Sequence, residues 1–167
     1  MDSKYRVVLL TPDDVDIARR IRLEALQNNP EAFGSSYAEE VLYSNDKFRE
    51  ILVRVKIFGL FCNDKIVGSV GFEVESMKKL AHNGCITGMY VTPAHRGNGA
   101  GSMLLKAVVE YAKGHVMQLY LYCISEGKGA IKFYEKHGFV TCGIHPRALK
   151  EGDKFYDTNV MLLELDQ

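Results

Sequence analysis

The chain has 167 residues, and its 21 Lys and Arg residues balance its 21 Asp and Glu residues, so the formal net charge is zero. This balance argues against a dedicated nucleic-acid-binding protein, because such proteins carry a basic excess that neutralises phosphates. A hydrophobic content of 47% with 10% aromatic residues excludes a disordered or low-complexity chain. The length, and the absence of repeats and linker-like stretches, predict one domain over residues 1–167.

The first third of the chain predicts a strand followed by helices. Residues 5–10 are a β-branched and apolar run typical of a strand, and Thr11-Pro12-Asp13-Asp14 is typical of a helix start. Apolar spacing extends that helix to about Gln27. Residues 36–43 and 45–56 predict two further helical pieces.

From residue 57 onward, the sequence alternates between strands and helices. Strands are predicted over residues 57–62, 66–74, 85–91, 116–123, 139–142 and 155–165. Helices are predicted over residues 99–113 and 129–137. A hairpin-rich first half and a strand–helix–strand second half imply an α/β (α+β) fold with a mixed, mostly antiparallel sheet flanked by helices.

Composition and motifs also bear on where the chain resides. The N-terminal residues lack the apolar stretch of a secretory signal, and no apolar run is long enough to cross a bilayer. The five histidines show no metal-ligand spacing. No C-x-x-C pair occurs, and the cysteines lie in apolar runs typical of buried reduced thiols: Cys62, Cys85, Cys123 and Cys142. We therefore expect a cytoplasmic protein that binds no membrane and no metal.

The most informative segment spans residues 89–102. It leads from a strand end through a proline and Arg96 to three alternating glycines and an amphipathic helix. Gly97, Gly99 and Gly101 carry no side chains where backbone N–H groups converge at the helix N-terminus, which is typical of a phosphate site. Arg96 adds a cationic donor. The segment predicts a diphosphate-binding loop, and a glycine-rich turn without a ligand is the alternative.

This loop departs from two common nucleotide-binding motifs. A P-loop requires G-x-x-x-x-G-K-[ST], which the sequence lacks. A dinucleotide-binding loop requires G-x-G-x-x-G, but counting from Gly97 the third glycine position is Ser102. The hairpin-rich chain before the loop also differs from an opening β-α-β unit, so a Rossmann-like nucleotide binder is disfavoured.

Two motifs resemble the GNAT superfamily of acyl-CoA-dependent N-acetyltransferases. Residues 96–101 match the acyl-CoA signature [QR]-x-x-G-x-[GA], and residues 91–97 match its usual prelude V-x-P-x-x-R-G. Residues 130–139 match a second signature, A-x-x-x-Y-x-x-x-G-F, in the family's order and spacing. The resemblance covers nearly the whole chain and implies a central sheet of about seven strands, in which the fourth and fifth strands splay apart.

The resemblance implies an enzyme that transfers an acetyl group from acetyl-CoA to a primary amine of a small molecule or peptide, by direct attack in a ternary complex. A non-catalytic acyl-CoA-binding or sensing module of the same fold is the alternative. The implied partners are acetyl-CoA as co-substrate, the amine acceptor and a second copy in a homodimer, with no nucleic acid. On the same resemblance, the acceptor cleft is expected to involve Phe33, Ser36, Tyr37, Tyr156 and Asp157.

The resemblance also implies which residues form the site. The cofactor is expected to contact the strand end and the loop, at Met89, Tyr90, Val91, Arg96, Gly97, Asn98, Gly99, Ala100, Gly101 and Ser102. Tyr134 is the expected general acid that protonates the leaving thiolate, and a core aromatic role is its alternative. Gly88 inside the strand predicts a bulge or a close backbone approach, or else simple packing.

Two parts of the site stay open. Glu73 and Glu75 share one face of a strand and face either the cleft or solvent, so no general base is assigned and a water relay is an alternative. Gly127 stands where the family often has an asparagine that is expected to hold the cofactor chain. That hydrogen bond is expected either to be lost or to be replaced by Ser125 or Lys128.

Overall fold

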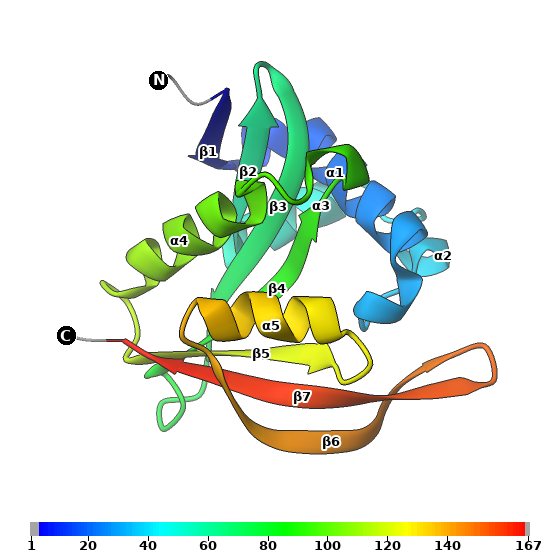
Figure 1. Cartoon of the computed structure of the whole chain (residues 1–167). Coiled ribbons are helices and arrows are strands. Elements are labelled where there is room, and N and C mark those ends of the chain that lie inside the picture. Colours follow the sequence, from blue (N-terminus) through cyan, green and yellow to red (C-terminus); the bar gives the residue numbers. More distant parts are fainter. Residues whose placement is uncertain (1–3, 166–167) are drawn as a thin grey trace.

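A computed structural model describes residues 4–165, and seven strands there form one sheet in the order β1-β2-β3-β4-β5-β7-β6 (Figure 1). The strands are β1 (Tyr5–Leu9), β2 (Lys56–Cys62), β3 (Lys65–Val74), β4 (Asn83–Val91), β5 (Gln118–Ile124), β6 (Val140–Glu151) and β7 (Lys154–Glu164). Adjacent strands run antiparallel except β4 and β5, which are parallel. The predicted mixed, mostly antiparallel sheet is confirmed.

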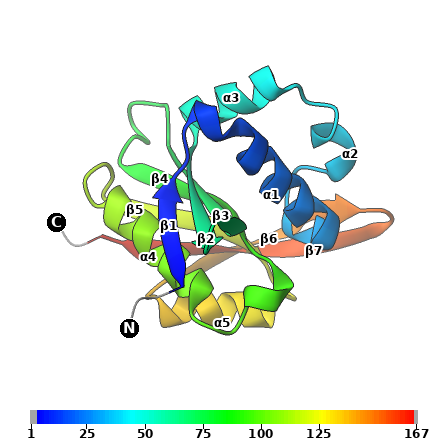
Figure 2. The same cartoon turned by 90° about the horizontal axis from the view of Figure 1, so that it is seen from above.

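Helices cover both faces of the sheet (Figure 2). The α-helices are α1 (Val15–Asn28), α2 (Tyr37–Glu40), α3 (Asn45–Arg54), α4 (Ala100–Ala112) and α5 (Lys128–Lys136). Short 3-10 helices are η1 (Pro12–Asp14), η2 (Pro30–Ala32) and η3 (Pro93–His95). The helices α1 to α3 lie on one face, and α4 and α5 lie on the other (Figure 2).

The two faces hold two separate apolar clusters. On the α4 side, Leu104, Leu105 and Val108 are completely buried, because their spacing places them on one stripe of the helix. On the other side, Ile21 of α1 and Leu52 of α3 pack into the second cluster. Helices therefore cover the sheet from both sides, and the ends of its strands remain available for a functional site.

Most elements predicted from the sequence end within two residues of the observed ones, but two differ. The helix predicted over residues 36–43 is the shorter α2. The strand predicted over residues 139–142 is the much longer β6. This strand lies at the edge of the sheet with most of its residues exposed, and it contains Pro146, so it carries neither the apolar run nor the unbroken pattern of an inner strand.

The expectation of four buried thiols is wrong. Cys123 is buried, Cys62 and Cys85 are half-buried, and Cys142 on β6 is exposed. Cys142 was misjudged for the same reason as its strand, because an edge strand offers solvent both of its faces. Within residues 4–165, no helix is long and apolar enough to span a membrane.

A buried glycine where β4 meets β5 gives a test of this packing. A Cβ on Gly84 would lie 3.1 Å from Leu119 Cδ2 and would collide with the ring of the buried Phe72. We expect Gly84→Ala to lower the free energy of unfolding by about 1–3 kcal/mol, measured by urea denaturation. Gly143→Ala on β6 is the matched control, since nothing lies within 4 Å of its added Cβ. Equal stability of the two variants would contradict the packing described.

Candidate active site

The parallel pair β4–β5 is joined over three residue pairs only. The register runs from Asn83 opposite Gln118 to Cys85 opposite Tyr120, and beyond this point neither strand pairs with the other. Figure 1 shows β4 rising away from β5 after this start. The predicted splaying of the fourth and fifth strands is confirmed, and it leaves the second half of β4 without a partner on that side.

A bulge in β4 lies where the gap opens. The β3–β4 register shifts so that Gly88 and Met89 of β4 lie opposite Val70 of β3 alone. Gly88 has φ +60°, a conformation that other residues rarely adopt. The expectation of a bulge at Gly88 is confirmed, and the bulge interrupts the regular main-chain pairing of β4 at this point.

The glycine-rich loop follows directly from the end of β4. Gly97 and Gly99 have φ of +76° and +78°, and Gly99 is the N-cap of α4. A Cβ added to either would meet nothing within 4 Å, so glycine is required by the backbone conformation and not by crowding. The first N–H groups of α4 have no carbonyl partner within the helix. The exposed loop and the N-terminus of α4 together form a site rich in N–H donors, which fits an anion.

Arg96 connects this loop to the rest of the protein. Its Nε donates to the Val91 carbonyl at 2.7 Å, its Nη2 donates to Asn29 Oδ1 at 3.1 Å, and the guanidinium lies 5.6 Å from the Tyr90 ring centroid. The side chain therefore braces the loop against β4 and the end of α1. Its expected contact with a diphosphate stays a prediction.

Tyr134 of α5 belongs both to the core and to the cleft. It is 8% exposed, and its ring packs against Phe133 and Phe139 at centroid distances of 5.2 and 5.7 Å. It also lines the cleft between β4 and β5. Burial, and secondarily the nearby Cys123, raise the pKa of Tyr134 above that of an ordinary phenol. The hydroxyl therefore stays protonated over the neutral and mildly alkaline range.

The cleft has a volume of about 750 Å³ and lies between η2, the diverging strands and the β6–β7 hairpin. Of the residues expected on the acceptor side, Phe33 and Tyr156 line it. The other three lie outside its lining. Ser36 and Tyr37 begin α2, where Ser36 accepts the Glu39 N–H, and Asp157 accepts the backbone N–H of Arg147 at 2.7 Å.

Several polar residues that line the cleft were not predicted from the sequence, and Thr158 and His145 are two of them. Thr158 of β7 is 3% exposed, and its Oγ1 has no hydrogen-bond partner within the described residues. His145 of β6 lies opposite Thr158 in the strand register and also lines the cleft. Neither could be placed from the sequence, because β6 was predicted to end at residue 142 and the pairing with β7 was unknown.

The two glutamates considered as bases are both engaged. Glu73 Oε1 accepts from Arg54 Nη1 at 2.6 Å, and Glu75 Oε1 accepts from the Tyr120 hydroxyl. Burial, followed by the bond to Glu75, raises the pKa of Tyr120, and burial raises the pKa of the neighbouring Cys85 thiol to about 11. Neither glutamate lines the cleft. The possibility that they project into the cleft is not supported.

The segment before α5 carries the position of the family asparagine. Gly127 is the N-cap of α5 and lines the cleft. The Ser125 hydroxyl donates to Asn159 Oδ1 at 2.6 Å, so it is held by β7. Replacement of the family asparagine by Ser125 or Lys128 stays a prediction.

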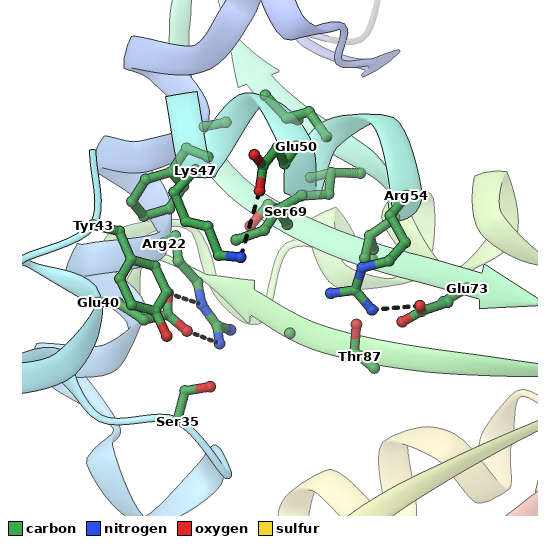
Figure 3. Close-up of a pocket in the computed structure, with 18 of the residues that line it drawn as sticks. Arg22, Ser35, Glu40, Tyr43, Lys47, Glu50, Arg54, Ser69, Glu73 and Thr87 are labelled. Atoms are coloured by element: carbon green, nitrogen blue, oxygen red, sulfur yellow. Dashed lines mark hydrogen bonds and ion pairs between the residues drawn. The ribbon is translucent and has the colours of Figure 1, made fainter. Parts of the chain in front are cut away.

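A second cavity of about 600 Å³, here called the charged cavity, lies between the helices α1 to α3 and the strands β3 and β4 (Figure 3). It shares Gly34, Thr87 and Gly88 with the cleft, so the two spaces meet at the bulge. Three ion pairs line it: Arg22–Glu40, Lys47–Glu50 and Arg54–Glu73. Among residues 4–165, no group of three or more His, Cys, Asp or Glu side chains could hold a metal ion.

Comparisons with known proteins agree with this architecture. YwnH of Bacillus subtilis, whose name associates it with phosphinothricin acetyltransferase, is 27% identical over 104 residues, which are 62% of this chain and 64% of YwnH. The chain spans less than two thirds of the length of the curated relatives that it matches.

Solved structures share the fold over nearly their whole length. An acetyltransferase of the GNAT family from Streptococcus pneumoniae superposes with a TM-score of 0.82 at 24% identity, covering 97% of this chain and 99% of that one. YncA of Salmonella typhimurium, solved with its cofactor acetyl-CoA, gives a TM-score of 0.82 at 19% identity and covers 99% and 96%. The family model described as "Acetyltransferase (GNAT) family" matches residues 19–139, more than half of the chain. The chain belongs to the acetyltransferase (GNAT) family.

Proposed function

We propose that this protein transfers the acetyl group of acetyl-CoA to a primary amine of a small molecule or peptide, by direct attack in a ternary complex. One observation carries the proposal: β4 separates from β5 to open the cleft lined by Tyr134, and the chain then passes through η3 and the glycine-rich loop to the donor-rich start of α4. The proposed anion-binding site and the cleft are thus formed by neighbouring segments of the chain. The acetyl-CoA held by YncA, a protein of the same fold, supports the choice of co-substrate.

The cofactor contacts follow from the backbone. The N–H groups of residues 97–102 would bind the diphosphate, since the first turn of α4 offers unpaired donors and the positive end of the helix dipole. The main chain of Met89, Tyr90 and Val91 would pair with the pantetheine arm, because this part of β4 has lost β5 as a neighbour. Arg96 would keep the loop in place through its bonds to Val91 and Asn29.

When bound, acetyl-CoA supplies an acetyl thioester whose carbon–sulfur bond breaks as the amine nitrogen forms its new bond to the acetyl carbon. A main-chain N–H of β4 near Met89 or Tyr90 would donate to the carbonyl oxygen as negative charge develops there. One such donor is worth about 3 kcal/mol of barrier. Tyr134 would give its proton to the departing sulfur and then regain one from water.

The raised pKa of Tyr134 has two opposite consequences for this step. It keeps the phenol protonated, so the donor form is present throughout the neutral pH range. It also makes the transfer to a thiolate, whose acid has a pKa near 8.5, an uphill step that needs close positioning. Because Glu73 and Glu75 are engaged elsewhere, we propose that the amine loses its proton to water in the cleft.

The expected homodimer also belongs to this proposal. Val140 and Ile144 of the edge strand β6 are each 60% exposed. Apolar side chains on an open edge favour pairing with another chain.

The proposed binding of the diphosphate by the glycine-rich loop can be tested at Gly99. We expect Gly99→Leu to raise the dissociation constant for acetyl-CoA by at least about tenfold in calorimetric titration, because a side chain would project from the N-cap into the open space of the site and strain the loop. Gly152→Leu is the matched control: it has φ +59° and equally open surroundings, but lies in the β6–β7 turn. If both variants bind acetyl-CoA as the unmodified protein does, the assignment of the loop fails.

The acid role can be tested at Tyr134. We expect Tyr134→Phe to lower kcat by about 100-fold while acetyl-CoA affinity changes less than about twofold, since only the proton is removed. In the unmodified protein, kcat should show no fall up to about pH 10, because the raised pKa keeps the phenol protonated there. Tyr111→Phe, a ring packed against Phe58 and Phe72 in the core, is the control. An unchanged kcat for Tyr134→Phe would remove the general-acid assignment, whereas absence of turnover in the unmodified protein would favour the non-catalytic acyl-CoA sensor.

A further inference from the structure

The charged cavity has one rigid cationic group at its junction with the cleft. Arg22 of α1 donates through Nε and Nη2 to the two carboxylate oxygens of Glu40, at 2.9 and 2.8 Å. Glu40 is 5% exposed, so this bidentate pair is largely withdrawn from water. The guanidinium also lies 5.2 Å from the ring centroid of Phe33, which lines the cleft. Two hydrogen bonds to Glu40 and the contact with Phe33 therefore fix the side chain in place.

The free end of this guanidinium faces the bulge. Nη1, which takes no part in the two bonds to Glu40, lies 3.3 Å from the position that a Cβ would occupy on Gly88. Gly88 is shared by the two cavities and stands beside Met89, where the acetyl carbonyl would be held. Figure 3 shows Ser35 on the same side of the cavity as Arg22 and Glu40, with Arg54 and Glu73 on the other side. Donors of Arg22 thus reach the place where an acceptor would meet the cofactor.

The charged groups of the cavity favour an acceptor that carries an anion over one that carries an additional cation. Each of the three carboxylates that line it, Glu40, Glu50 and Glu73, is already paired with a cation. A guanidinium has five N–H donors, and the bonds to Glu40 use two of those on Arg22. Arg22 therefore has donors to spare for an incoming carboxylate, and Glu40, the carboxylate nearest to it, already has both oxygens bound.

Resting on the acetyltransferase proposed above, we propose that the acceptor is a small amine with a carboxylate or similar anion on the same or the next carbon atom, and that Arg22 binds this anion. The short spacing follows from the closeness of Nη1 to Gly88, because an anion bound at Nη1 then lies near the bulge, beside which the attacking nitrogen would meet the acetyl carbon. Arg22 is then a specificity-determining residue that orients the amine toward the bulge.

Matched compounds separate this acceptor class from other amines. Release of free CoA would be measured with phenylalanine, phenylalaninamide and 2-phenylethylamine, and with lysine, lysinamide and cadaverine. Within each trio only the carboxyl group changes. We expect kcat/KM to be at least about tenfold higher for the acid than for its partners, the gain expected of a hydrogen bond between charged groups. Equal kcat/KM values within each trio, or higher values for the amide or for the compound without a carboxyl group, would overturn the proposal while leaving acetyl transfer intact.

Variants then test whether Arg22 is the cause. Arg22→Lys keeps a cation beside Glu40 but loses the forked donors, and we expect it to raise KM for the acids about 10- to 100-fold with kcat changed less than twofold. A merely structural role would change the acids and amides alike, so their ratio is the decisive readout. Arg49→Lys, whose parent side chain pairs with Asp46 on the outer surface of α3, is the control and should leave the ratio unchanged. An unchanged ratio in Arg22→Lys would overturn the assignment.

A binding measurement keeps this inference apart from the proposed function. Phenylalanine and phenylalaninamide would be titrated calorimetrically into the protein saturated with CoA. Binding of the acid that is weakened at least about tenfold by Arg22→Lys supports the inference whether or not turnover occurs. No binding of the acid, or equal binding by both proteins, overturns it. Absence of acetyl-CoA binding, or of turnover with every compound, counts instead against the acetyltransferase proposal.

Discussion

The separation of β4 from β5 after three residue pairs is the constraint on which the rest of the site depends. Main-chain donors and acceptors of an inner strand pair with neighbours on both sides, so a strand that loses one neighbour has groups left to bind water or a ligand. In this protein the separation coincides with the Gly88 bulge and precedes the glycine-rich loop by only a few residues. The loss of pairing between β4 and β5 therefore creates the gap and exposes main-chain groups of β4. The chain then continues through the loop to the donor-rich N-terminus of α4.

The surrounding packing makes this departure tolerable. The two apolar clusters hold the sheet from opposite faces, and α4 and the helices α1 to α3 cover the β1–β4 half before the gap opens. Arg96 adds a polar tie between the loop, β4 and the end of α1. Because stability is supplied away from the gap, the cleft can keep polar groups such as Thr158 Oγ1 without a hydrogen-bond partner among residues 4–165.

The parts of the fold that follow local rules were accessible from the sequence. The buried stripe of α4 follows the helical period, and the glycines before it sit at positive φ where glycine is favoured. The bulge at Gly88 was signalled by a glycine within a strand. In contrast, only the first residues of β6 were predicted, because the rest of this exposed edge strand, with its proline, has no apolar signature.

The same limit applies to the candidate site. Phe33 and Tyr156 reach the cleft as the resemblance implied, but Glu73 and Glu75 take partners from distant elements, Arg54 of α3 and Tyr120 of β5. Such pairings depend on how helices and strands pack in space, about which spacing along the chain says nothing. The junction of Arg22 with Gly88 is of this kind, since it joins α1 to the centre of β4.

The uneven accessibility of the four thiols has a practical consequence. Cys142 stands exposed on β6, whereas burial raises the pKa of both Cys85 and Cys123 and keeps them in the unreactive protonated form. A maleimide dye would therefore attach most readily to Cys142 on the β6–β7 hairpin, both strands of which line the cleft, and less readily to the half-buried Cys62. The protein thus carries a natural fluorescent labelling point from which movements of that hairpin could be followed.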